Sequence, residues 1–386
     1  MRSTFFLILI ALGGCDGLFG IHDSVPRGDA SNVGGDGKVF MDAPADARAC
    51  WATGIPDLCF ATPPSGDVPL TGALDTTTDA RCSSSFSANC VIAGGKIDVD
   101  TLLVNGARPL VLVASDTLTV TGKLDVASHV STPAKSGPGA VAATCHPFGQ
   151  PVPDKNGTNG TGGGAGGSYG NTGGAGGGND SGAHGGATST AVDGNRFAAG
   201  CRGEDGASAN PGPPMIYGLG GAGGGAAYLV GGNAITIAGV VNASGAGGFG
   251  GECVTPCNNS ADGEAHGGGG GGAGGMIVLE APSIANTGSI FADGGGGGEG
   301  ASHSTSGASG QDPLGATAAL GGSAEGSHHG GPGGAGGHGA AVVGAGGVGT
   351  TEYSGGGGGG GGGGVGKIVV YGGGTLTGNV SPTPMP

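Results

Sequence analysis

The stretch "GGMIVLEAPSIANTGSIFADGGGGG" (residues 274–298) sets two strand-like phrases, Ile277–Ala281 and Ile284–Ala292, between runs of glycine. Many apolar residues in these phrases recur at every second position, which is the period of a β-strand. Glycine loses more backbone entropy on ordering than any other residue, so the flanking runs have little tendency to form regular structure alone. The pattern predicts strands that pack on other strands, with the glycines as long excursions between them.

The same phrase recurs along the chain. Residues 110–128, 227–245 and 276–294 align without a gap, a shortened copy covers residues 367–380, and an irregular copy covers residues 90–105. Each full copy has a glycine where the chain turns between two strands. The aligned positions are Val111, Tyr228 and Ile277; Val113, Val230 and Leu279; Leu118, Ile235 and Ile284; Gly122, Gly239 and Gly288; and Leu124, Val241 and Ile290.

A single copy has one apolar face and buries it only by stacking on its neighbours. We therefore expect an all-β fold, namely a short right-handed parallel β-helix (β-solenoid) of four or five coils, with a β-sandwich as the second choice. The Cys50–Cys90 region, which includes Trp51, Phe60 and Phe86, is expected to cover the first edge of the sheet.

The expected organisation has four parts. A lipoprotein signal peptide covers residues 1–14, and a lipid anchor with a flexible tether covers residues 15–48. A disulfide-containing cap with the first coil covers residues 49–105. The solenoid covers residues 106–386, with glycine-rich insertions at 129–226, 246–275 and 295–366.

The glycines, 101 of 386 residues, follow a pattern in places. They recur every third residue at Gly157, Gly160, Gly163 and Gly166, and again at Gly330, Gly333 and Gly336. Three residues per turn is the period of polyproline-II-type helices. We hypothesise polyglycine-II segments packed beside the strands; flexible glycine loops are the alternative. Strict collagen is excluded, because the Gly-X-Y frame is not sustained.

The net charge of the chain limits the classes of partner that it can bind. The chain has 13 Lys and Arg against 28 Asp and Glu, a formal net charge of −15. This balance argues against nucleic acid or an anionic membrane surface as a partner. The excess acid is spread along the chain, which fits a role in solubility.

The N-terminal sequence "MRSTFFLILIALGGC" has one basic residue, an apolar run and then small residues, as in a signal peptide. Leu12, Gly13, Gly14 and Cys15 resemble the lipobox of bacterial lipoproteins, which implies lipidation of Cys15. A plain secretory peptide cut near these residues is the alternative. The prediction is an exported protein anchored to a membrane through its N-terminal lipid, at the outer membrane or cell surface.

Eight cysteines remain after Cys15, and an even number in an exported chain predicts disulfides. Their spacing suggests four pairs of neighbours: Cys50–Cys59, Cys82–Cys90, Cys145–Cys201 and Cys253–Cys257. The alternative for the last pair is a metal site with His266.

Catalytic residues are not evident, and we expect no catalytic, cofactor-binding or metal-binding residue. Acidic residues on the strands, the candidates for carbohydrate cleavage, do not align into one cluster; they are Asp98, Asp100, Asp116, Asp125, Glu280 and Asp293. Eight histidines fall in the insertions, where solvated side chains or a metal or proton-sensitive patch are the alternatives; they are His129, His146, His184, His266, His303, His328, His329 and His338.

Several phrases, including "CVIAGGKI", "GGMIVLEAPSI" and "GVGKIVVYGGGTL", resemble the glycine-rich lipoproteins of myxobacteria; the likeness to PE-PGRS proteins is one of composition only. The resemblance implies a location in the cell envelope and no particular activity. The predicted function is a structural or adhesive surface protein, with extracellular polysaccharide or other envelope proteins as partners. The alternative is a carbohydrate-binding or carbohydrate-cleaving β-helix. A third class is binding of ice or surface water through a flat glycine/alanine face, for which the sequence shows no repeated Thr ladder.

Overall fold

In the computed structural model the chain divides into Met1–Ala47 and a compact unit, Arg48–Pro386. The structure describes residues 49–385 except for 53–57, 132–134, 141–144, 146–159, 180–184, 192–195, 209–217, 254–264, 303, 316, 324–329, 341–342 and 350–355. The predicted signal peptide, Cys15 and the tether therefore lie outside the described residues. Among the described residues, no helix is long and apolar enough to cross a membrane.

The secondary structure of the described residues consists of β-strands. In chain order they are β1 (Ala49–Cys50), β2 (Cys59–Phe60), β3 (Asp67–Asp75), β4 (Cys90–Gly94), β5 (Lys96–Asn105), β6 (Leu110–Ala114), β7 (Thr117–Asp125), β8 (Ala226–Gly231), β9 (Ala234–Ile237), β10 (Val240–Asn242), β11 (Met276–Asn286), β12 (Ser289–Phe291), β13 (Lys367–Leu376) and β14 (Asn379–Ser381).

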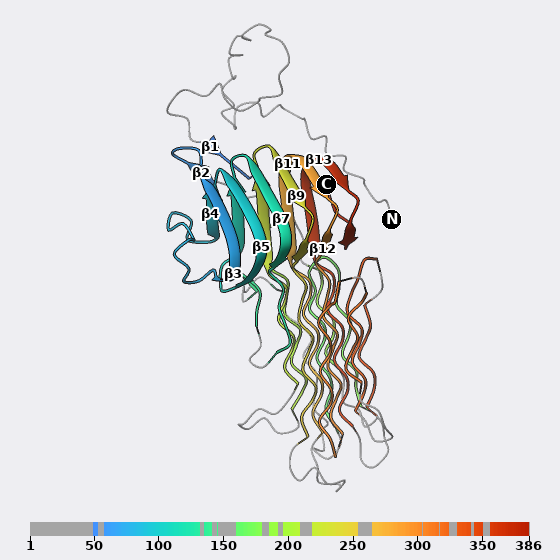
Figure 1. Cartoon of the computed structure of the whole chain (residues 1–386). Helices are drawn as coiled ribbons and strands as arrows, with labels where there is room; N and C mark the ends of the chain where they lie inside the picture. The colour runs from blue at the N-terminus through green and yellow to red at the C-terminus, as the bar shows by residue number, and fades with distance from the viewer. Residues whose placement is uncertain are drawn as a thin grey trace, which may run out of the picture. The chain divides into compact units, whose positions relative to one another are not determined.

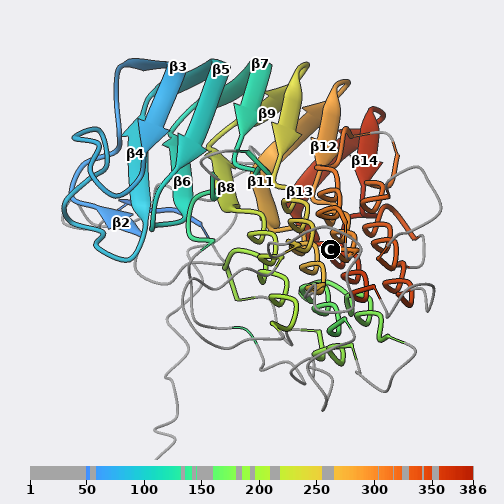
Figure 2. The same ribbon diagram turned by 90° about the horizontal axis from the view of Figure 1, so that it is seen from below.

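Twelve of these strands form one parallel sheet, and β1 and β2 form a separate antiparallel pair. The large sheet bends into two layers (Figures 1 and 2). One layer contains β4, β6, β8 and the first halves of β11 and β13; the other contains β3, β5, β7, β9 and the second halves. The short strands β10, β12 and β14 continue the sheet from the end of β7. The main core lies between the layers, where residues such as Leu112, Leu118, Leu229 and Ile284 are fully or almost fully buried.

The prediction of a β-solenoid is wrong. A solenoid closes each coil, whereas these strands form one continuous sheet that is not closed. β11 pairs with β8 along its first half and with β9 along its second half, so the sheet runs on through the bend. After the second-layer strands the chain turns and adds short strands, the end of β7, β10 and β12, which pair with one another in the same sheet. A glycine-rich insertion follows each of them, and the sheet stays open. A sandwich of two separate sheets is wrong for the same reason.

The alignment of the repeats is largely confirmed by the strand register. Leu118 pairs with Ile235, and Ile235 pairs with Ile284, as aligned. One part is wrong by a residue, because Tyr228 pairs with Val278 and not with Ile277. A register shift in the pairing of β11 with β13, between Ala281 and Ser283, makes Pro282 an extra residue in β11.

The glycine-rich insertions form ordered segments that run side by side away from one end of the sheet (Figure 1). We call the described residues within 160–208, 218–225, 243–253, 265–275, 292–322, 330–349 and 356–366 the glycine bundle. Backbone amides three residues apart donate to carbonyls three residues apart on a neighbouring segment, as three residues per turn requires. Gly268, Gly271 and Gly274, for example, donate to Gly358, Gly361 and Gly364.

Close approach explains why these segments need glycine. A Cβ built on Gly270 would collide with the carbonyl oxygen of Ala165, and one on Gly360 with that of Gly269. The expected three-residue period is present, since Gly163 and Gly166 both donate to a neighbouring segment; Gly157 lies outside the described residues. The alternative, flexible glycine loops, is therefore wrong for these residues.

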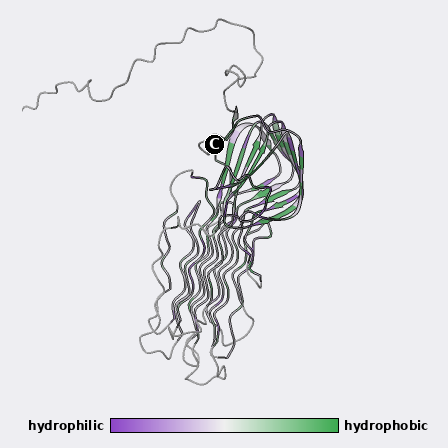
Figure 3. Ribbon diagram, turned by 90° about the vertical axis from the view of Figure 1, so that its left-hand side faces the viewer, coloured by the Kyte–Doolittle hydropathy of each residue, from purple (hydrophilic) through white to green (hydrophobic). Residues whose placement is uncertain are grey.

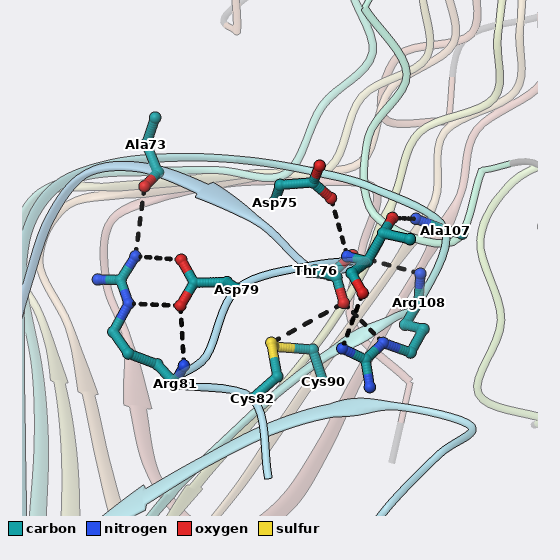
Figure 4. Close-up of a disulfide and its surroundings, with 10 residues drawn as sticks. Ala73, Asp75, Thr76, Asp79, Arg81, Cys82, Cys90, Ala107 and Arg108 are labelled. Atoms are coloured by element: carbon teal, nitrogen blue, oxygen red, sulfur yellow. Dashed lines mark hydrogen bonds and ion pairs between the residues drawn. A yellow bond between two sulfur atoms is a disulfide. The ribbon is translucent and has the colours of Figure 1, made fainter. Parts of the chain in front are cut away.

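The N-terminal part of the unit covers the outer face of the first layer. Trp51, Phe60 and Phe86 pack against a second apolar cluster that contains Val111 and Tyr228. The edge strand β4 also receives a hydrogen bond, from the Ser83 amide to the Val91 carbonyl. Figure 4 shows how the Cys82–Cys90 disulfide lies among side chains that tie this region together, with Arg81 paired to Asp79 and Arg108 bonded to the Thr76 carbonyl. The cap therefore covers a face as well as an edge.

Candidate functional site: a threonine face

The outer face of the second layer presents short, uncharged side chains in a regular grid. Four strands contribute three residues each; the third lies within β7 on the first strand and just beyond the strand end on the other three. We call these twelve residues the threonine face: Thr117, Thr119 and Thr121; Ala234, Thr236 and Ala238; Ser283, Ala285 and Thr287; and Gly373, Thr375 and Thr377. Nine of them are exposed, and Thr117, Thr119 and Ala234 are half-buried.

Strand register brings these residues into rows. Thr119 pairs with Thr236, Thr236 with Ala285, and Ala285 with Thr375. Neighbouring strands lie ~4.8 Å apart, and alternate residues of a parallel strand lie ~6.6 Å apart. The grid therefore measures roughly 14 Å by 13 Å between outer backbone positions.

The alternation of side chains supports the face from behind. Between the outward residues, Leu118, Val120, Ile235, Ile237 and Ile284 point inward and are fully or almost fully buried in the core. Threonine is β-branched, so its χ1 rotation is restricted. Figure 3 shows the hydrophobic colour concentrated in the strands and nearly absent from the glycine bundle.

A column of glycines lies at the end of the grid, where each chain turns. A Cβ built on Gly239 would collide with the carbonyl oxygen of Gly122, one on Gly288 with that of Gly239, and one on Gly378 with that of Gly288. The close stacking of successive turns therefore requires the glycine that the copies share. Gly378 of the fourth copy extends this column.

The hydroxyls of the face differ in their partners. Thr121 Oγ1 donates to the Val99 carbonyl at 3.3 Å, and Thr377 Oγ1 donates to the Asn286 carbonyl at 3.1 Å. Within the described part of the chain, Thr119, Thr236 and Thr375 make no side-chain hydrogen bond with protein groups. These three side chains lie on the outer face, because they alternate with buried residues along their strands.

Charged residues border the face but do not enter it. Asp98 and Lys96 on β5 are exposed and lie beside the β7 end of the grid. Lys123 lies beyond the turn, where it forms an ion pair with Asp125 at 2.7 Å. In a chain of net charge −15, an uncharged grid of this kind is a distinct surface.

The candidate carboxylates do not form a catalytic pair. Asp98 and Asp100 are exposed on β5, and Asp116 accepts a hydrogen bond from Asn233 at 2.7 Å. Glu280 accepts one from the Tyr228 hydroxyl. Asp125 and Asp293 each bond to a different histidine. Each acid therefore has a local structural explanation or is solvated.

One histidine cluster lies where β7 leaves the sheet. His129 Nε2 contacts Asp125, and its Nδ1 contacts Asp312, each at 3.3 Å. The hydrogen bonds to Asp125 and Asp312 raise the pKa of His129 to about 9. Asp312 also accepts the Val130 and Gly247 amides, both at 2.9 Å. The cluster joins the end of β7 to the glycine bundle.

A second cluster resembles a catalytic triad in composition only. Asp293 is fully buried, and its carboxylate contacts His338 Nδ1 at 3.1 Å and accepts the Ser381 hydroxyl. Burial raises the pKa of Asp293 to about 6, although Ser381 and His338 act to lower it. Ser381 is 3% exposed and His338 Nδ1 faces both partners, so no nucleophile is presented to a substrate. The cluster ties the last strand to the bundle.

Two titratable side chains are buried inside the glycine bundle. Glu204 is 5% exposed; one carboxylate oxygen accepts the Ala165 amide at 3.2 Å, and the other has no hydrogen-bond partner. Burial raises the pKa of Glu204 to about 7. His266 is also buried, and burial lowers its pKa to about 4.

Three of the four predicted disulfides are present: Cys50–Cys59, Cys82–Cys90 and Cys145–Cys201. Cys253 is disulfide-bonded, and Cys257 lies outside the described residues. Among the described residues no group of three His, Cys, Asp or Glu side chains is arranged to hold a metal. Five of the eight predicted histidines lie outside the described residues: His146, His184, His303, His328 and His329.

Comparison with protein-family models, curated proteins and solved structures gave no match. Sequence analysis missed the threonine face, because its members are separated by the long insertions. The signal is a four-residue phrase at each turn: "TVTG" (119–122), "TIAG" (236–239), "ANTG" (285–288) and "TLTG" (375–378).

Proposed function

We propose that this protein is a lipid-anchored component of the cell surface that adheres through the threonine face. One observation carries the proposal: twelve short, uncharged residues, eleven of them with a side chain, form a regular grid on a sheet whose opposite side is a packed core. An extended, exposed grid suits a repeating partner better than a small molecule, which binds in a concave pocket.

The glycine bundle supports an adhesive role because it is a scaffold of backbone hydrogen bonds. Its segments bond to their neighbours at every third residue, as between Gly331, Gly334 and Gly337 and the segment that begins at Gly357. Membrane attachment through Cys15 and export follow from the N-terminal sequence and remain part of the proposal. In this role the protein binds its partner without converting it chemically.

Protease shaving of intact cells tests the location. Release of fragments of this protein from intact cells is expected; protection in intact cells with digestion after lysis would exclude surface display.

Binding of the purified full-length protein to envelope material and polysaccharides tests adhesion. Thr236→Lys, at the centre of the grid, should abolish binding, and Leu314→Lys should not, because Leu314 is 87% exposed on the glycine bundle. Equal binding by both variants would refute adhesion through this face.

A further inference from the structure

We propose that the last end of the sheet, formed by β13 and β14, binds the same end of a second copy of this chain. The proposal concerns assembly and does not depend on adhesion through the threonine face. Three contrasts with the first end, formed by β3 and β4, support it: how well the core is covered, how the edge strand is protected, and where charged residues lie.

The core is covered at the first end of the sheet and left partly open at the last. β3 and β4 lie at one end, and β13 and β14 lie at the other (Figure 2). On β3, Leu70 and Leu74 are 1% exposed. On the last two strands, Val370, Leu376 and Val380 pack against the same core but are only half-buried. Apolar side chains left in partial contact with water favour a partner that covers them.

One row of core residues shows what the last end lacks. Strand register pairs Leu118 with Ile235 and Ile235 with Ile284, and the next residue in the row is Gly374. The three large side chains are fully or almost fully buried, whereas Gly374 is exposed and brings no side chain to the core. The row therefore ends one residue short, and apolar side chains of a second copy would continue it.

The two edge strands differ in their protection against pairing. Proline, charged side chains and covering segments are the devices that block addition of a strand. β3 contains Pro69, which has no amide to donate, and its Ala73 carbonyl accepts a hydrogen bond from Arg81. On β13, Met385 pairs beside Val369 in the first half of the strand. Among the described residues, however, the second half of β13 pairs only with β11, and β14 pairs only with β12. The last edge is therefore the one open to an added strand.

The distribution of charge favours a second copy as the partner. Residues 368–386 contain no Asp, Glu, Lys or Arg, in a chain whose net charge is −15. Two copies of this acidic chain can therefore meet at their last ends without setting like charges against each other. Two first ends cannot, because Asp67 and Asp75 are exposed on β3. A basic protein, which the net charge would attract, finds no side-chain carboxylate on residues 368–386.

Protection of the first end determines the symmetry of the pair. Head-to-tail addition needs an open first edge on each copy, and it continues into a filament unless it closes into a ring. Two last ends instead form a closed pair about a two-fold axis, in which the same residues face each other and the β13 strands run antiparallel. Such a pair joins the second layers of both copies and carries two threonine faces.

Sedimentation equilibrium of the purified full-length protein in density-matched detergent, over a range of concentrations, tests the proposal. The wild type should reach twice the monomer mass and no more. Val380→Lys places an unpaired ammonium group at the last end of the core and should lose the dimer. Val68→Lys makes the identical change at a half-buried residue of β3 that packs against the same core, and it should keep the dimer.

A single spin label per copy gives a second measurement that leaves the core intact. Asn379 is exposed on β14, so the folded Asn379→Cys protein carries the label at the last end. Electron paramagnetic resonance should give a narrow, short distance between the labels of two copies. The same label at Asp67→Cys, exposed on β3, should give no short distance.

Thermal unfolding of each variant establishes that it is folded. A wild type that stays monomeric, or that grows beyond the dimer, would overturn the proposal. Retention of the dimer in folded Val380→Lys, or its loss in folded Val68→Lys, would place the contact elsewhere on the molecule. If Val380→Lys does not fold, the label at Asn379→Cys decides, and the absence of a short distance there would refute pairing of the last ends.

Discussion

Thr119 of β7 and Thr236 of β9 are register partners in a parallel sheet, although the whole of the first glycine-rich insertion lies between them in the chain. The pairing places both side chains on one face and continues through Ala285 to Thr375. The long insertions leave the strand order intact because they form a bundle of their own.

Substitution of a bundle glycine should destabilise the protein. Gly270→Ala places a methyl group against the Ala165 carbonyl, which is backbone and is itself hydrogen-bonded. Overpacking of this kind costs about 1–3 kcal/mol, so chemical denaturation should show a lower free energy of unfolding. Gly373→Ala is the control, since Gly373 is exposed and its nearest neighbour would be the Pro282 oxygen at 3.3 Å. Equal stability of both variants would mean that the bundle is loosely packed.

Stability should fall between pH 4.5 and 7 because of Glu204. Its pKa is about 7 when folded against an ordinary 4.5, so the folded protein keeps a proton that the unfolded chain releases in this window. The free energy of unfolding should decrease by roughly 3 kcal/mol as the pH rises through the window. Glu204→Gln should remove that decrease and stabilise the protein at pH 8. Glu252→Gln, at an exposed residue, is the control. If the pH profile of Glu204→Gln matches those of the wild type and of Glu252→Gln, Glu204 is solvated in the folded protein.

His129 should contribute a pH dependence in a different window. Its pKa is raised to about 9, so its ion pairs with Asp125 and Asp312 stabilise the fold fully below pH 6.5. That stabilisation should be lost as the pH rises from 6.5 through 9. Thermal unfolding of His129→Gln should show a lower midpoint than the wild type at pH 6, with the difference shrinking towards pH 10. A constant difference across this range would argue against the ion pairs.

Of the three disulfides whose two cysteines both lie among the described residues, Cys145–Cys201 should contribute most to stability. It closes a sequence separation of 56 residues, against 9 for Cys50–Cys59. Loop entropy gives about 4 kcal/mol for the first and about 2.5 kcal/mol for the second. Replacing each pair by serine and comparing chemical denaturation should reproduce this order. A larger loss from Cys50 and Cys59 would indicate that strain or the packing of β1 and β2 dominates.

Sequence analysis predicted the strand copies and most of their register, because buried alternation is a local signal. Leu118, Ile235 and Ile284 stack as aligned. The fold class was wrong because whether a sheet closes depends on the path between copies. β11 bends from one layer to the other within a single strand, and no local pattern indicates that bend.

The functional face was harder to predict than the core. The residue type of Ile235 is enough to predict that it is buried in the core. Thr236 and Ala285 are of types common on any surface, so they indicate a functional site only when their neighbours on adjacent strands are known. Only the register shows that they form a grid. The histidine clusters were likewise hidden, since Asp312 and His129 are brought together from distant insertions.

The most direct test of the grid is the distance between spin labels at Thr119→Cys and Ala285→Cys, on either side of β9. Electron paramagnetic resonance on the folded, doubly labelled protein should give a narrow distribution consistent with backbones about 10 Å apart, two strand spacings. A broad distribution, or one centred well beyond twice that distance, would show that β7 and β11 do not flank β9 and that no continuous threonine face exists.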